Sequence, residues 1–183
     1  MKKTVLTFGL ISGTILSLMM FATLPFMDRI GFDNGMIVGY TTMVISFLLV
    51  FFGIRWYREE IGDGRITFYM AFVVGILITL ISCVFYVVSW EVIYFNFVPD
   101  FVEKYAAYAL EKARAAGASQ QALETQRQQL ESMAQMYKNP LINAALTFLE
   151  PFPVGLVITL LSAAILRRKE PAPQSSDPTA AQA

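Results

Sequence analysis

Long stretches without charge dominate the pattern of hydrophobic and polar positions along the chain. Residues 4–27 contain no charged side chain, and as a helix they would extend for about 36 Å, more than the ~30 Å hydrocarbon core of a bilayer. Residues 36–54 and 66–90 are equally free of charge, and residues 143–166 are interrupted only by Glu150. The pattern therefore predicts an all-α, polytopic membrane protein with four transmembrane helices at these positions.

A polar segment, residues 99–140, separates the last two of these stretches. Its apolar positions recur at helical spacing, and Asp100 can cap a first helix that Gly117 would end. Ser119 can then cap a second helix, so we expect a helical hairpin. Two interpretations stay open: the hairpin is a solvated connection between two spans, or it is an arm that docks on another membrane protein or on a second copy of the chain.

The lysines and arginines are distributed unevenly between the ends of the predicted spans, and positive charge is retained on the cytoplasmic side. Most of them lie before the first span, between the second and third, or after the fourth: Lys2, Lys3, Arg55, Arg58, Arg65, Arg167, Arg168 and Lys169. Both termini should therefore be cytoplasmic and the hairpin extracytoplasmic. The first span is too long for the apolar region of a cleaved signal peptide, which favours an uncleaved anchor. We expect residues 1–169 to form one membrane domain and residues 170–183, rich in Pro, Ser and Ala, to be a disordered tail.

Small residues recur four positions apart in the predicted spans, a spacing that lets helix backbones approach closely in lipid. The glycines that we expect at such helix contacts are Gly9, Gly13, Gly35, Gly39, Gly75 and Gly155. Packing within the chain or between copies is the first interpretation. The alternative is that these glycines line a conduction path.

Glu150 is the one formal charge inside the fourth stretch, and Pro151 and Pro153 follow it closely. Counting back from the basic residues at the inner surface places it about 25 Å along a helix, roughly one turn inside the outer boundary. At that depth a carboxylate can tilt toward water, and Pro151 can begin a helix without losing a hydrogen bond. The functional alternative is a polar cluster in which Glu150, Glu91 and Arg29 face the bundle interior, with Arg29 as the partner of Glu150.

The short loop between the second and third spans carries Arg55, Arg58 and Arg65. We expect these side chains to contact anionic lipid headgroups, while the Gly-Asp-Gly sequence at residues 62–64 makes the turn. A cytoplasmic ligand or partner site is the alternative interpretation.

Composition excludes several classes of function. Hydrophobic residues make up 56% of the chain, above the ~45–50% of a soluble domain. The 14 basic and 14 acidic side chains leave no positive footprint for nucleic acid. The chain has no histidine and one cysteine, Cys83, which excludes an internal disulfide and Cys/His metal or catalytic sites. We therefore expect neither an enzyme nor a bound metal or cofactor.

Four segments together resemble a known family. They are the opening "KKTVLTFGLISG", the inner-loop "FFGIRWYREEIGDGRITFYMAFVVG", the "VPDFVEKYAAY" after the third span and the closing "EPFPVGLVITLLSAAILRRK". Over about residues 1–169 the chain resembles bacterial membrane proteins that are grouped as a domain of unknown function and are common in Bacteroidota. The resemblance implies a four-helix integral membrane protein with an extracytoplasmic helical insert, and we expect it in the bacterial inner membrane. It brings no established activity, substrate or cofactor.

These observations favour a non-enzymatic membrane protein that acts through association with proteins or with membrane lipids. A small transporter or channel subunit that uses Glu91 and Glu150 is the alternative, because membrane carboxylates and proline-broken helices can form ion paths.

Overall fold

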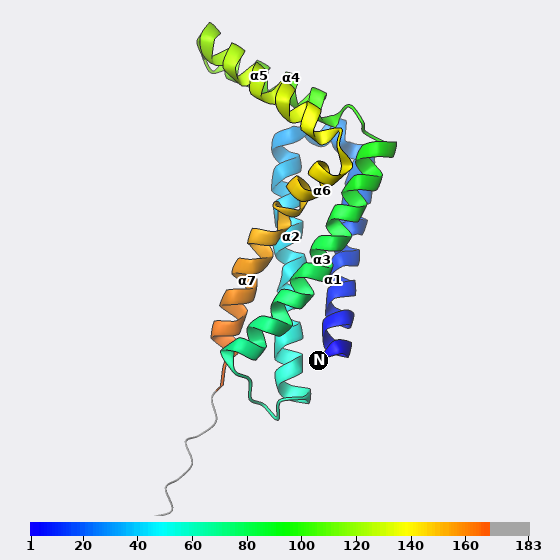
Figure 1. Ribbon diagram of the computed structural model, residues 1–183, viewed down its shortest axis with the longest axis vertical. Helices are drawn as coiled ribbons and strands as arrows, with labels where there is room; N and C mark the ends of the chain where they lie inside the picture. The colour runs from blue at the N-terminus through cyan, green and yellow to red at the C-terminus, as the bar shows by residue number, and fades with distance from the viewer. Residues whose placement is uncertain (169–183) are drawn as a thin grey trace, which may run out of the picture.

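The computed structural model describes residues 1–168, and almost all of them are helical (Figure 1). The helices are α1 (Lys2–Thr23), the short 3-10 helix η1 (Leu24–Phe26), α2 (Met27–Glu60), α3 (Phe68–Asn96), α4 (Phe101–Ala115), α5 (Gln120–Tyr137), α6 (Pro140–Phe148) and α7 (Pro151–Leu166). Within residues 1–168, four helical stretches are long and apolar enough to cross a membrane, namely α1 with η1, α2, α3, and α6 with α7. The predicted all-α fold with four spans is confirmed. The tail expected at residues 170–183 lies outside the described residues.

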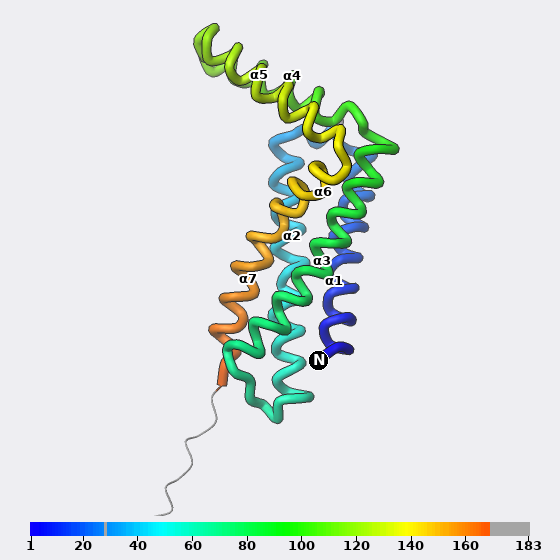
Figure 2. The backbone as a smooth tube through the Cα atoms, in the orientation of Figure 1, coloured from blue at the N-terminus to red at the C-terminus, as the bar shows by residue number. Residues whose placement is uncertain are grey.

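The four spans run alternately in opposite directions and form a bundle (Figures 1 and 2). α2 and α3 each pack against both α1 and α7, and they also contact each other. The N-terminus, the loop between α2 and α3 and the end of α7 lie together at one end of the bundle, which we call the terminal end. α4 and α5 lie at the opposite end, which we call the arm end.

α2 begins well before the charge-free residues 36–54 and is kinked near its start. Gly31 has φ +69° and ψ 168°, values that interrupt the helix, and glycine adopts a positive φ without steric cost. The chain turns at this point from a short segment across the arm end into the long helix that reaches the terminal end (Figure 2).

The best-packed core lies in the half of the bundle nearest the terminal end. Four residues of α2 there are almost completely buried: Met43, Phe47, Val50 and Ile54. Small residues bring α3 and α7 close together, because a Cβ added to Gly75 would lie 2.8 Å from Cγ2 of Thr159, and one added to Gly155 would lie 2.4 Å from Cγ2 of Thr79. The hydroxyls of Thr79 and Thr159 also share a hydrogen bond of 3.0 Å. Close packing of this kind holds helices together in lipid.

The fourth span is two helices rather than one. α6 ends at Phe148 and α7 begins at Pro151, because proline has no N–H to donate to a carbonyl of the preceding turn. α6 packs against α3 and α5, whereas α7 packs against α2 and α3. The break therefore carries the first part of this span away from α2.

α4 and α5 pack along each other and form an arm, residues 101–137, that crosses the arm end of the bundle and projects past it (Figure 1). Gly117 has φ +82° after the end of α4, and the Ser119 hydroxyl accepts a hydrogen bond of 3.2 Å from the N–H of Ala122, so it caps α5 as predicted. Asp100 precedes α4 but makes no capping bond; its carboxylate pairs with Lys104 at 3.0 Å. The side of the membrane on which the arm lies stays a prediction.

Candidate membrane-embedded site

Glu150 lies at the break between α6 and α7, and its hydrogen-bond partner is a tyrosine of α3. Its Oε2 accepts a hydrogen bond of 2.8 Å from the Tyr86 hydroxyl. Tyr86 is buried, whereas Glu150 is exposed on the surface of the bundle. A carboxylate at membrane depth is costly to leave without a partner, so the Tyr86 hydroxyl stabilises the break from inside.

Two further tyrosines lie near this pair. Tyr40 of α2 and Tyr137 of α5 are close enough to Tyr86 to interact with it electrostatically. Burial raises the pKa of Tyr137, and the nearby Glu150 carboxylate raises it further, because two negative charges side by side are unfavourable. Tyr137 therefore keeps its proton at neutral pH. We call Tyr40, Tyr86, Tyr137 and Glu150 the tyrosine–glutamate cluster.

Asn143 fixes α6 against α3. Its side chain is completely buried, and its Oδ1 accepts hydrogen bonds of 3.1 Å from Nε1 of Trp90 and from Oγ1 of Thr147. Its Nδ2 donates to the carbonyl of Tyr137 at 3.2 Å. One amide thus joins α3, α5 and α6. Sequence reasoning missed it, although an asparagine inside an apolar run, with a threonine four residues on, is a usable signal.

One side of α2 is covered at the terminal half and uncovered at the arm half. Residues 36, 40, 43 and 47 lie on the same side of this helix by their spacing. Met43 and Phe47 are 1% and 0% exposed, and a Cβ added to Gly155 of α7 would lie 3.0 Å from the Phe47 ring. Met36 and Tyr40 are 56% and 46% exposed. α7 therefore covers this side of α2 up to the break, and α6 does not continue the cover.

Gly35 and Gly39 lie beside these exposed residues, and they do not make the helix contacts within the chain that the sequence predicts. A Cβ added to either would meet nothing within 4 Å, because α6 has moved to α3. The other glycines of the prediction do lie against a neighbouring helix, where an added Cβ would come within 2.9 Å of a side chain: Gly9, Gly13, Gly75 and Gly155. We call the uncovered residues the open face of α2: Gly35, Met36, Gly39 and Tyr40.

The expected pairing of Arg29 with Glu150 is not found. Within residues 1–168, no hydrogen bond or ion pair joins Glu150 to Arg29 or to Glu91. Arg29 is exposed near the start of α2, whereas Glu150 turns toward the face of α3 that carries Tyr86. Glu91 lies elsewhere on α3, and its Oε1 is buried without a hydrogen-bond partner. The predicted three-residue cluster is replaced by the tyrosine–glutamate cluster.

The inner-loop arginines differ in what they contact. The Arg58 side chain is 12% exposed and pairs with Glu59. Its Nη1 donates to the carbonyl of Leu166 at 3.3 Å, so it satisfies a carbonyl at the end of α7. Arg55 and Arg65 are exposed, and their contact with lipid headgroups stays a prediction.

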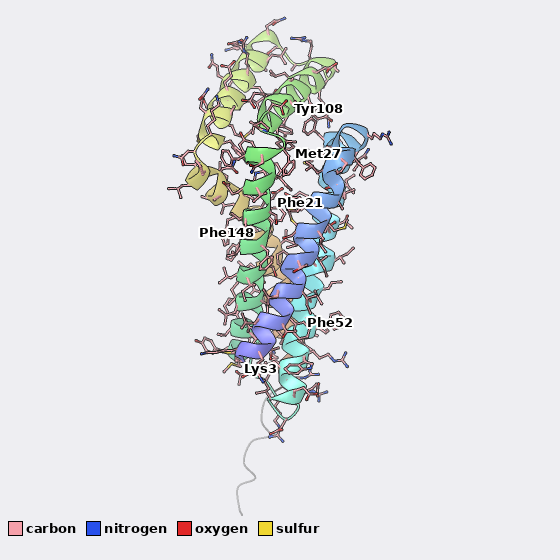
Figure 3. The ribbon with its side chains drawn as sticks, turned by 90° about the vertical axis from the view of Figure 1, so that its right-hand side faces the viewer. Lys3, Phe21, Met27, Phe52, Tyr108 and Phe148 are labelled. Atoms are coloured by element: carbon pink, nitrogen blue, oxygen red, sulfur yellow. The ribbon has the colours of Figure 1, made fainter. Side chains whose placement is uncertain are left out.

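An aromatic contact attaches the arm to the start of α2. Phe32 lies between 5.1 and 5.7 Å, measured between ring centroids, from three rings of α4, which belong to Phe101, Tyr105 and Tyr108. In Figure 3, Tyr108 lies at the same end of the bundle as Met27, the first residue of α2, and far from Lys3. Sequence analysis did not foresee this contact, since Phe32 and Tyr108 are far apart along the chain.

An ion pair completes the attachment. Nζ of Lys112 donates to both carboxylate oxygens of Asp33, at 2.7 and 2.8 Å, and lies 5.6 Å from the centre of the Tyr108 ring. The Asp33 carboxylate raises the pKa of Lys112 because it stabilises the charged ammonium. We call the contact of Phe32 and Asp33 with α4 the arm contact.

The long apolar helices and the buried polar groups at a helix break define a polytopic, helical integral membrane protein. The chain belongs to the family described as "Protein of unknown function (DUF4199)", which matches residues 7–168. This match confirms the family resemblance over nearly all of the described residues. No curated protein and no solved structure matches the chain.

Proposed function

We propose that the protein acts through association within the membrane, without catalysis, and that a membrane lipid occupies the open face of α2. The observation that carries this proposal is the empty space over Gly35 and Gly39 on a helix that buries Met43 and Phe47 on the same side in its terminal half. Apolar surface at membrane depth is covered by lipid when no helix covers it. Here the surface is bordered by the polar groups of the tyrosine–glutamate cluster.

The shape of the open face favours an acyl chain over a helix. α2 meets α7 at Phe47, so the uncovered stretch from Met36 to Met43 is about 10 Å long. A transmembrane helix with its side chains is about 10–12 Å in diameter, and it would meet α7 before it reached the lower part of this stretch. A flexible chain can follow the narrowing space.

Photocrosslinking tests the proposal directly. A photoreactive amino acid in place of Tyr40 should give a discrete lipid adduct by mass spectrometry of the full chain in native membranes. The matched control replaces Ile45, which is 58% exposed and lies about 140° around α2; its adducts should reflect the bulk lipid composition. Equal adduct patterns at the two positions would refute lipid occupancy, and a protein adduct at Tyr40 would assign the open face to a partner helix or a second copy.

The proposal includes an orientation and a location. Both termini lie in the cytoplasm of a bacterial cell and the arm lies outside the inner membrane, supported by the basic residues near the terminal end. The arm is then the surface available to a membrane-protein partner or a second copy. Labelling of a Gln120→Cys variant in intact cells should succeed with a membrane-impermeant reagent, and protection of that thiol would refute this orientation.

A second candidate function is a small transporter or channel subunit. It is favoured by the break in the fourth span, where the exposed Glu150 carboxylate is bound by Tyr86 of α3. Vesicles that contain the protein should then pass ions or solutes, and Glu150→Gln should abolish the flux. Flux that survives this substitution would remove Glu150 from any such path.

A further inference from the structure

A cavity of about 330 Å³ lies between the start of α2 and the arm. On the α2 side it is lined by Phe32, Asp33 and Met36, and on the α4 side by Tyr105, Tyr108 and Lys112 among others. Its volume is at the lower end of the range for small-molecule sites, about 300–1,000 Å³. It therefore suits a compact group rather than a large ligand.

The charges in this cavity form one opposite pair. Lys112 and Asp33 bind each other, yet their side chains are 59% and 55% exposed, so each still presents surface to the cavity. Aromatic rings stand beside the carboxylate and attract cations through their faces. The cavity thus offers a cation and an anion within a few ångströms of each other, and a ligand that carries both charges can match it.

The cavity also leads into the open face of α2. Met36 belongs to both, since it lines the cavity and is one of the exposed residues of the open face. Met36 is also the first residue of the charge-free run 36–54. The cavity therefore lies where a bilayer passes from headgroups to hydrocarbon, and the open face continues from it into the hydrocarbon.

We propose that this cavity holds the headgroup of a zwitterionic phospholipid whose acyl chain lies on the open face of α2. Asp33 and the neighbouring rings take the ammonium, and Lys112 takes the phosphate. A headgroup with a phosphate but no amine would bring a second anion beside the paired Asp33 and Lys112, with no cation of its own to offset the Asp33 carboxylate. The inference rests on the proposed function, because it names the class of lipid that occupies the open face.

The experiment measures retained lipid on the purified full chain after exchange into nanodiscs of equimolar phosphatidylethanolamine and phosphatidylglycerol. Native mass spectrometry should show phosphatidylethanolamine enriched about threefold to tenfold on the wild-type protein, a range that one additional charge-assisted contact supplies. Asp33→Asn should bring the ratio close to one while total bound lipid stays similar, and Asp33→Glu should restore the preference.

Three further variants separate the possible failures. Gly39→Leu should lower the binding of both lipids by filling the open face. The control Thr41→Leu adds the same side chain to an exposed position about 200° around α2 and should change nothing. Glu131→Gln removes a carboxylate of the arm that pairs with Arg127 and does not line the cavity, and it should leave the lipid ratio unchanged.

Each result decides between the two claims. A preference that survives Asp33→Asn, or that is absent from the wild type, overturns the headgroup inference and leaves the proposed function standing. Bound lipid that is unaffected by Gly39→Leu overturns the proposed function itself. If Asp33→Asn lowers the unfolding temperature, the Asp33→Glu variant decides, because a folded protein with the carboxylate and no preference contradicts the inference.

Discussion

The two halves of the bundle share α1, α2 and α3, but their fourth helix is α7 in the terminal half and α6 in the arm half, and they are packed differently. In the terminal half, Gly75 and Gly155 bring α3 and α7 so close that an added Cβ would overlap a threonine methyl group. In the arm half, Gly35 and Gly39 have the same four-residue spacing that favours helix contact, but nothing lies opposite them. Small residues therefore permit close packing, while the path of the neighbouring helix decides whether it occurs.

The path of that neighbour is set by a few polar groups at the break. Asn143 holds α6 against α3 through Trp90, and Tyr86 holds Glu150 where α7 begins. Since a buried amide in lipid must have partners, α6 follows α3 rather than α2. The open face is therefore a consequence of hydrogen bonding on the opposite side of the bundle.

The largest difference in stability should be found when a glycine in each half is replaced by leucine. We expect Gly155→Leu to destabilise the protein by about 3 kcal/mol or to abolish the folded yield, because the new side chain would collide with Thr79 and Phe47. Gly39→Leu should change stability by less than about 0.5 kcal/mol. Thermal unfolding of both variants in one detergent measures the difference. Equal losses would mean that the open face is packed in solution.

The next largest effect should come from Asn143→Ala. This change leaves the Trp90 N–H and the Tyr137 carbonyl without their partner, which we expect to cost about 2 kcal/mol. Asn96→Ala is the matched control, since its amide bonds only to the carbonyl of Val92 in its own helix, at 2.8 Å. Denaturant unfolding followed by tryptophan fluorescence should separate the two. A neutral Asn143→Ala would show that α6 is held in place by other contacts.

A double-mutant cycle should resolve the partner of Glu150. Tyr86→Phe and Glu150→Gln should couple by about 1 kcal/mol, the usual contribution of one hydrogen bond. Arg29→Ala and Glu150→Ala should be additive within about 0.3 kcal/mol, because the structure does not pair these residues. Coupling between Arg29 and Glu150, without coupling to Tyr86, would reverse the assignment.

The smallest effect should be the pH dependence of the arm contact. Asp33 raises the pKa of both Lys112 and Tyr108 relative to their ordinary values of 10.5 and 10.0. A group whose pKa is raised on folding stabilises the folded state below its unfolded pKa and loses that contribution as the pH rises through the folded value. On the alkaline side the contact should therefore be unchanged from neutral pH to about pH 9 and should weaken above about pH 10.

Spin labels on Ile37→Cys and Gln121→Cys can follow this contact, because the native cysteine, Cys83, is buried. The label-to-label distance should be constant between pH 7 and 9 and should broaden at higher pH. Broadening already at neutral pH would contradict the structure. An unchanged distance at pH 11 would show that the aromatic rings alone hold the arm.

Sequence reasoning identified the parts of this structure that depend on local composition. Spans need only a run of apolar residues, and the break needs only Glu150 followed by Pro151, so both are legible in the chain. The partner of Glu150 was wrong, because the rotation of α3 determines that Tyr86 faces the break. Gly35 and Gly75 both stand in apolar runs with a small residue four positions away. Only the paths of α6 and α7 in the folded protein determine that Gly75 is packed and Gly35 is not. Asp33 and Lys112 of the arm contact are 79 residues apart in the sequence. No local sequence pattern indicates that they meet.

The length of α7 has a consequence for the surrounding bilayer. α7 has 16 residues and extends for about 24 Å, less than the ~30 Å of hydrocarbon that a straight span would cross. Beyond α7 the chain continues as α6, which is displaced toward α3. The apolar surface beside α7 is therefore shorter along the membrane normal than the apolar surface of α1 or α3. Lipids there should shorten or tilt to match, which costs a fraction of a kcal/mol per ångström of mismatch. The protein should therefore carry a locally thinned annulus on one side and should partition toward thinner membranes.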